Sequence, residues 1–102
     1  MDKMPSTVKV GPHQYSIIRK PASALPDALG TCDFQLLQIC IRQRMRRSKA
    51  QETLLHEILH SATHPTVNCS DKRDDEEFVT AIAPVLLGVL KDNPDLVGYL
   101  TR

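Results

Sequence analysis

The feature that most constrains this chain is a change in the spacing of its apolar residues near residue 42. Before that point, short β-branched and aromatic runs alternate with polar residues, whereas after Ser48 apolar residues recur every three or four positions. A spacing of two is typical of strands, and a spacing of 3.6 is typical of helices. The sequence therefore predicts an α+β protein, with the strands first and the helices second.

Three strands are predicted in the first part of the chain. The runs "TVKV" and "YSIIR" flank the turn formers Gly11 and Pro12, so residues 7–19 are expected to form a hairpin. In "LLQICI" (residues 36–41) apolar residues occupy alternate positions, which indicates a half-buried strand. Residues 20–31 show no such pattern and are predicted to form a connection. The prediction is a small three-stranded sheet.

Helical patterns fill the second part. Ser48 and the glutamine three residues later have the form of a capping box, and apolar residues then recur at helical spacing until Pro65. A second helix is expected to begin in the acidic run at residues 74–77, where carboxylates suit the positive end of the helix dipole, and to end before Pro94. A short last helix is expected at residues 95–101.

Composition limits the classes of protein that fit this pattern. With 102 residues, 41% of them apolar, the chain can bury one modest core, so residues 1–102 are predicted to form a single domain. A net charge of +1 argues against a dominant attraction to nucleic acid or membranes. The odd number of cysteines (Cys32, Cys40 and Cys69) and the lack of a C-x-x-C pair predict reduced thiols, and the expected location is cytoplasmic.

The motif H-E-x-x-H is the strongest functional feature. His56 and His60 are four residues apart, so on a helix both imidazoles can reach one tetrahedral Zn²⁺ at about 2.0–2.1 Å. Glu57 is turned by about 100° from His56, which takes it off the metal and places it where a general base would hold the attacking water. The predicted reaction is zinc-dependent hydrolysis of peptide bonds, with Glu57 as the general base.

A catalytic zinc normally has three protein ligands, so a third is needed. His64 lies about 12 Å along a straight helix from His56, too far to share one ion, and is interpreted as a residue at the end of the helix. The candidates are two glutamates at the start of the second predicted helix, Glu76 and Glu77. Glu77 is favoured because it shares a face with apolar residues that should pack inward, and Glu76 is the alternative.

Two further features have a weaker claim to function. Tyr15 and Tyr99 could each supply a hydroxyl that stabilises an oxyanion, although a tyrosine in so small a domain is more often part of the core. The segment "RQRMRRSK" (residues 42–49) carries five cationic residues that could contact a phosphate backbone or an acidic peptide. It is interpreted as a solvated turn, and a nucleic-acid partner is not expected because no aromatic residues interleave with the charges.

The segments "TLLHEILH" and "EEFVTAIAPVLLGVLKDNP" resemble small single-domain metallopeptidases of the gluzincin type, of the ImmA/IrrE and SprT-like kind found in bacteria and bacteriophages. The resemblance implies a minimal zincin-like fold, in which the sheet packs on the helix with His56 and His60 and a second helix brings Glu77 to the metal. It also implies that an edge strand, here "LLQICI", pairs with an extended protein or peptide substrate. The resemblance further implies a cytoplasmic regulator of the kind that cleaves repressors, among other targets.

A second function of a different class fits the same residues. In a non-catalytic module, zinc would be a structural ion that stabilises the fold. The sheet edge or the basic segment would then bind a host or phage protein. Glu57 favours the enzyme, because a structural zinc site needs no carboxylate beside its histidine. No C-terminal subdomain is evident to close the far side of a groove, so a protein partner or a homodimer is expected to complete it.

Overall fold

A computed structural model describes residues 3–64 and 76–102 of the chain, with the side chains of residues 76, 77, 79 and 80 outside that description. Four strands and three helices follow one another within these residues, in the order β1 (Thr7–Val10), β2 (His13–Lys20), β3 (Gly30–Asp33), β4 (Gln38–Arg42), α1 (Arg47–Thr63), α2 (Glu76–Asp92) and α3 (Pro94–Leu100). The predicted order of strands before helices is confirmed.

The strands form one mixed sheet in the order β1-β2-β4-β3. β1 and β2 are the predicted hairpin, in which Val10 pairs with His13 across a two-residue turn. Gly11 has φ +60°, a backbone conformation that glycine adopts without strain and that a two-residue hairpin turn needs at its first central position. β2 pairs with β4 in parallel, with Ile17 opposite Ile39, and β3 pairs with β4 antiparallel.

The predicted fold class was wrong in two respects, although the chain is an α+β protein. The sheet has four strands, because Gly30–Asp33, which begins in the predicted connection and was not expected to be a strand, forms β3. The minimal zincin-like arrangement is not found either. Across residues 3–64 and 76–102, as far as their side chains are described, no three His, Cys, Asp or Glu side chains lie close enough together to hold a metal ion.

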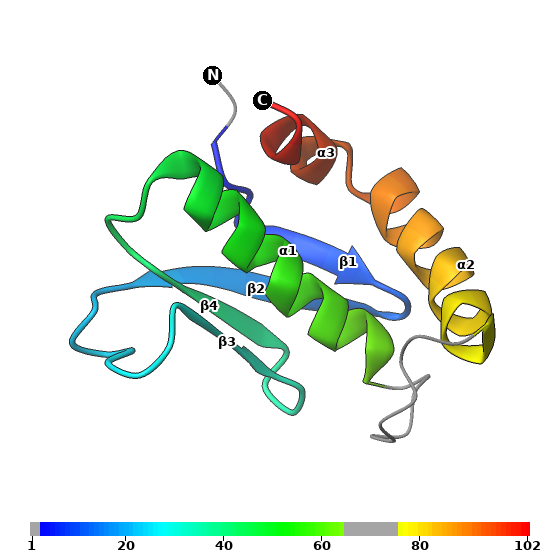
Figure 1. Ribbon diagram of the computed structural model, residues 1–102, viewed down its shortest axis with the longest axis horizontal. Coiled ribbons are helices and arrows are strands. Elements are labelled where there is room, and N and C mark those ends of the chain that lie inside the picture. Colours follow the sequence, from blue (N-terminus) through cyan, green and yellow to red (C-terminus); the bar gives the residue numbers. More distant parts are fainter. Residues whose placement is uncertain (1–2, 65–75) are drawn as a thin grey trace.

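α1 crosses one face of the sheet, and the core lies between them (Figure 1). Of the five apolar residues at helical spacing in α1, Leu55 and Leu59 are 37% exposed, whereas Leu54, Ile58 and Ala62 are fully buried. They pack with the inward side chains of the strands, namely Val8, Val10, Tyr15, Ile17, Ile39 and Ile41. The predicted capping box is wrong, because Arg46 with its extended backbone takes the N-cap position, which places Ser48 inside the first turn.

α2 lies beside β1, and the short α3 turns back over the start of α1 (Figure 1). Asn93, between the two helices, fixes this arrangement. Its Oδ1 accepts a hydrogen bond from the Lys9 N–H at 2.9 Å, and its Nδ2 donates to the Lys9 carbonyl at 2.8 Å and to the Val89 carbonyl at 2.7 Å. The junction of α2 and α3 is thereby held to β1. Among the helices described, none is long and apolar enough to cross a membrane.

Candidate functional site

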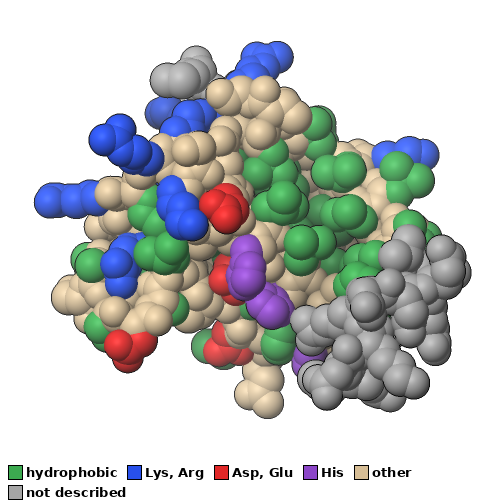
Figure 2. Space-filling view, viewed as in Figure 1, with side chains coloured by type: hydrophobic (Ala, Val, Ile, Leu, Met, Phe, Trp, Pro, Cys, Tyr) green, Lys and Arg blue, Asp and Glu red, His purple; other side chains and the backbone are tan. Residues whose placement is uncertain are grey.

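The H-E-x-x-H residues lie on α1 where its buried face meets its exposed face. His56 and His60 are exposed to solvent, whereas Glu57, one position further along, is only 6% exposed. This difference follows from the helical step of about 100° per residue, which turns Glu57 toward β3 and leaves the histidines on the outer surface. Histidine side chains are visible at the centre of this surface in Figure 2, next to a patch of hydrophobic side chains.

The two histidines converge. The Nε2 atoms of His56 and His60 lie 3.1 Å apart, and the two rings meet edge to face with 4.7 Å between their centroids. Two nitrogens bound at 2.0–2.1 Å to one tetrahedral ion would lie about 3.3–3.4 Å apart. The observed separation is close to that value, so a small adjustment of the two rings would let both nitrogens bind one zinc ion. Without a metal, one Nε2–H can donate to the other ring.

Burial raises the pKa of Glu57 above that of an ordinary glutamate, and the neighbouring His56 and His60 act in the opposite direction. Burial is the larger effect because the charged carboxylate loses its hydration at this position. The same surroundings raise the pKa of the Cys32 thiol to about 12, through its own burial and through the negative charges of Glu57 and Asp33. Glu57 therefore interacts electrostatically with both histidines and with the Cys32 thiol.

Gly30 is the residue that lets β3 approach α1 so closely. A Cβ atom at this position would lie 2.9 Å from Thr53 Cγ2 and 3.2 Å from Glu57 Cγ. Ordinary contacts between carbon atoms are about 3.5–4.0 Å, so only glycine fits between the strand and the helix. The contact places the Glu57 side chain directly against the first residue of β3.

A cavity of about 310 Å³ opens at this contact. On one side it is lined by the backbone entering β3, and on the other by the face of α1 that carries Glu57 and His56. The lining residues are Ala28, Leu29, Gly30, Lys49, Glu52, Thr53, His56 and Glu57. The acid and one of the two histidines therefore share a surface hollow that could accept a side chain of a bound peptide.

The edge strand beside the site is β3, not "LLQICI" as predicted. The latter segment forms the turn before β4 and most of β4 itself, which lies between β2 and β3. The Arg42 N–H donates to the Leu29 carbonyl at 2.9 Å, so alternate residues from Leu29 onward direct their backbone groups toward β4. Gly30 and Cys32 therefore direct theirs toward the outer edge of the sheet, next to Glu57.

Other residues singled out in the sequence lie elsewhere. Glu76 and Glu77 are in the first turn of α2, but their side chains are outside the described residues, so the predicted third ligand is untested. His64 caps the C-terminus of α1 and stacks on Phe34 with 3.8 Å between the ring centroids. The two candidate tyrosines, Tyr15 and Tyr99, are 4% and 3% exposed and belong to the core cluster.

Sequence reasoning missed Gly30, Cys32 and the lining of the cavity. One signal was available for Gly30, because an isolated glycine ahead of a strand often marks a close approach of two backbones. No local signal was available for Cys32, since its proximity to Glu57 depends on the pairing of β3 with β4 and on the packing of α1.

Comparison of the chain with protein-family models, with curated proteins and with solved structures gives no match. Its function is therefore inferred from the motif on α1 and from the geometry around it.

Proposed function

We propose that this protein is a zinc-dependent peptidase that uses His56 and His60 as metal ligands and Glu57 as general base. The observation that carries the proposal is the convergence of the two histidine Nε2 atoms, 3.1 Å apart, on the outer face of α1 beside the buried Glu57. A hydrogen bond between the two rings gives the same contact without a metal, so the buried carboxylate one position along the helix is the second feature that supports the proposal.

Bound zinc would supply a Lewis acid that polarises the peptide carbonyl and makes water more acidic. Glu57 would accept the proton from the attacking water and deliver it to the leaving amine. Its position supports this role, because a carboxylate that is largely shielded from solvent does not exchange its proton freely with bulk water. The raised pKa, caused mainly by burial, makes the protonated intermediate state of Glu57 more accessible than it would be for an exposed glutamate.

The substrate is proposed to be a protein segment in extended conformation, paired with the outer edge of β3. Gly30 and Cys32 offer the backbone groups for such pairing, and the edge passes within contact distance of the Glu57 side chain. A side chain of the bound segment would enter the cavity lined by Leu29 and Thr53. A folded substrate would not fit this mode, so unstructured segments or exposed termini are the expected targets.

The experiment compares cleavage of an unstructured protein, such as reduced and alkylated casein, by the wild type, Glu57→Gln and Asp95→Asn, each loaded with zinc. Glu57→Gln keeps the shape of the side chain and is not a ligand, so it should retain zinc while cleavage falls by about 10²–10⁴-fold. Asp95→Asn makes the same change of charge on α3 and should cleave like the wild type.

Equal cleavage by Glu57→Gln and the wild type would exclude this mechanism. If the wild type holds zinc and cleaves no substrate, the remaining alternative is a non-catalytic module in which zinc stabilises a binding surface.

A further inference from the structure

A second cavity, of about 440 Å³, lies at the end of the β1–β2 hairpin. Residues 10–13 of the hairpin form one side of it, Phe34 and the last turn of α1 form another, and Val85 of α2 forms a third. Figure 1 shows the hairpin turn between the end of α1 and α2. The cavity shares no lining residue with the one at Glu57, so it is separate from the proposed peptidase site.

The lining of this cavity is uncharged. Among the described residues that form it, none is Lys, Arg, Asp or Glu. Val10, Ala62 and Val85 contribute aliphatic side chains. Phe34 contributes a ring that stacks on His64, with 3.8 Å between the centroids and 7° between the planes. A charged ligand would lose its hydration here and gain no opposite charge in return.

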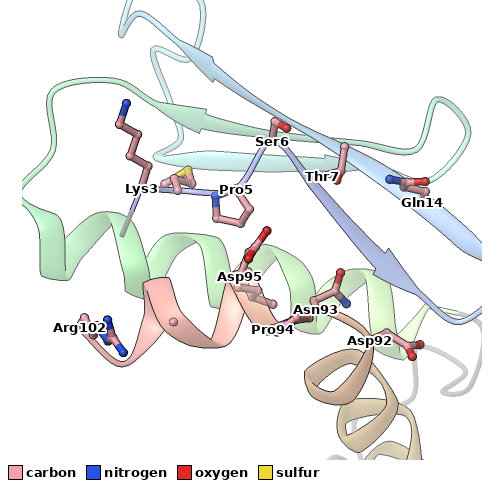
Figure 3. Close-up of a pocket in the computed structure, with 13 residues that line it drawn as sticks. Lys3, Pro5, Ser6, Thr7, Gln14, Asp92, Asn93, Pro94, Asp95 and Arg102 are labelled. Carbon is pink, nitrogen blue, oxygen red and sulfur yellow. The ribbon is translucent and has the colours of Figure 1, made fainter. Parts of the chain in front are cut away.

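A cavity of about 760 Å³ at the start of β1 shows the contrast. Lys3, Asp92, Asp95 and Arg102 line it together with several polar side chains (Figure 3). Asp92 also pairs with Lys9 at 3.2 Å. Charged and polar solutes therefore suit the cavity at the start of β1, whereas neutral, apolar ones suit the cavity at the end of the hairpin.

One polar group of the uncharged cavity lacks a partner. Tyr15 is 4% exposed and lines the cavity, and its hydroxyl makes no hydrogen bond with any of the described residues. The fully buried polar side-chain atoms without a partner in this part of the chain belong to Arg42 and Arg47. The Tyr15 oxygen is not one of them, so it keeps a small accessible surface that a ligand can contact.

The Tyr15 hydroxyl extends from β2 toward β3. Burial, and to a lesser extent the charge on Cys32, raises the pKa of this hydroxyl. Cys32 lies on β3, two residues before Phe34, so the electrostatic interaction places the hydroxyl on the side where Phe34 and His64 line the cavity. Because its pKa is raised, the hydroxyl stays protonated at neutral pH and can donate a hydrogen bond.

We propose that this cavity binds a small neutral molecule in which a carbonyl group is attached to an apolar body. The carbonyl oxygen would accept a hydrogen bond from the Tyr15 hydroxyl, and the apolar body would lie against Phe34 and Val85. Leaving a buried hydroxyl without a partner is unfavourable, so the carbonyl group adds affinity that a hydrocarbon cannot provide. The volume of about 440 Å³ is within the range of about 300–1,000 Å³ that is usual for small-molecule sites.

The test uses four probes of nearly the same shape, namely acetophenone, α-methylstyrene, benzoate and benzamidine. Acetophenone has the carbonyl group, α-methylstyrene has a methylene group in place of the oxygen, and the other two carry a negative and a positive charge. Binding is followed by amide chemical shifts of the wild type, Tyr15→Phe and Tyr99→Phe. Tyr99 is the matched control, because it is a second buried tyrosine, 3% exposed, that does not line the cavity.

A second pair of variants tests the location. Val85→Phe adds bulk to a residue that lines the cavity, whereas Leu87→Phe adds bulk on the same helix at a position that is 53% exposed and does not line it. Both changes keep an apolar side chain on α2.

We expect acetophenone to shift the wild-type amides of residues 10–15 and 61–64. Tyr15→Phe should weaken acetophenone binding by about 3–10-fold and α-methylstyrene binding by less than about 2-fold, because only the ketone accepts the hydrogen bond. Tyr99→Phe should change either by less than about 2-fold. Benzoate and benzamidine should bind the wild type at least about 10-fold more weakly than acetophenone. Val85→Phe should weaken acetophenone binding by about 10-fold or more, and Leu87→Phe by less than about 2-fold.

Four results would overturn the proposal. The first is that acetophenone does not shift the wild-type amides around the cavity. The second is that Tyr15→Phe changes the binding of acetophenone and α-methylstyrene by the same factor, because the hydroxyl would then not hold the carbonyl group. The third is that a charged probe binds as tightly as acetophenone, and the fourth is that Val85→Phe binds acetophenone like the wild type. If Tyr15→Phe does not fold, Val85→Phe and the order of the probes on the wild type decide the outcome.

Discussion

Adding a single methyl group at Gly30 should disturb the contact between β3 and α1 that brings Glu57 to the edge of the sheet. In Gly30→Ala the new Cβ would lie 2.9 Å from Thr53 Cγ2, 3.1 Å from the Cys40 carbonyl oxygen and 3.2 Å from Glu57 Cγ. Because carbon atoms normally approach to about 3.5–4.0 Å, the overlap with Thr53 alone is roughly 0.6–1.1 Å.

Neither of the two closest neighbours can easily move away. The Cys40 oxygen belongs to the backbone of the adjacent strand, and Thr53 is a β-branched residue whose Oγ1 donates to the Lys49 carbonyl at 2.8 Å. β3 must therefore move away from α1. Overpacking of this kind costs about 1–3 kcal/mol, which for a domain of this size lowers the Tm by about 4–8 °C for each kcal/mol.

Denaturant unfolding of four proteins measures the effect: the wild type, Gly30→Ala, Thr53→Ser and the double variant. Thr53→Ser removes the clashing methyl group and keeps the hydroxyl, so it should recover about 1 kcal/mol of the loss caused by Gly30→Ala.

A fifth protein, Gly88→Ala, is the control, because a Cβ at Gly88 meets no atom within 4 Å. In the interior of α2 this change should stabilise by about 0.5–1 kcal/mol. A Gly30→Ala protein within 0.5 kcal/mol of the wild type, or no coupling to Thr53→Ser, would refute the reasoning.

Three further outcomes are expected. Because its pKa is raised to about 12, the Cys32 thiol should react with iodoacetamide at pH 8 about 10³-fold more slowly than in the urea-unfolded chain, as followed by peptide mass spectrometry; equal rates would contradict the burial of this thiol. Burial raises the pKa of Glu57 in the folded state. In zinc-free protein, the contribution of Glu57 to the free energy of unfolding is therefore lost as the pH rises through that pKa. Glu57→Gln should then have a higher Tm than the wild type at pH 8, with the difference vanishing toward about pH 4; an equal Tm at both pH values would be the contrary result. Asn93→Ala removes the hydrogen bonds to Lys9 and Val89 and should lower the free energy of unfolding by about 1–3 kcal/mol, whereas a loss below about 0.5 kcal/mol would show that the α2–α3 junction is held by other contacts.

The parts of the fold that depend on local pattern could be predicted from the sequence. The Gly11 turn places the first hairpin, and the spacing of Leu54, Ile58 and Ala62 identifies the buried face of α1. The i, i+4 spacing of the two histidines likewise predicts their convergence, because it depends only on the geometry of one helix. These features need no information from distant residues.

The remaining features depend on contacts between distant segments. β3 has a short polar sequence without alternation, and it is a strand because β4 pairs with it and α1 packs on it. The parallel pairing of β2 with β4 made β3 the edge strand beside Glu57, and no local pattern reports such pairing.

Zinc stoichiometry is the most direct test of the proposed site. Wild type, His56→Ala, His60→Ala and His64→Ala are dialysed against a small excess of zinc, and bound metal is measured by atomic absorption. His64 is the control, because it stacks on Phe34 at the end of α1 and does not join the converging pair. The same measurement on Glu77→Ala and Glu76→Ala tests the ligand that the sequence predicts.

The account predicts about one zinc ion per chain in the wild type and in His64→Ala, and loss of tight binding in His56→Ala and in His60→Ala. Loss in Glu77→Ala but not in Glu76→Ala would identify Glu77 as the third ligand. Stoichiometric zinc that persists after replacement of both His56 and His60 would contradict the central claim, because the metal would then be held at another part of the molecule.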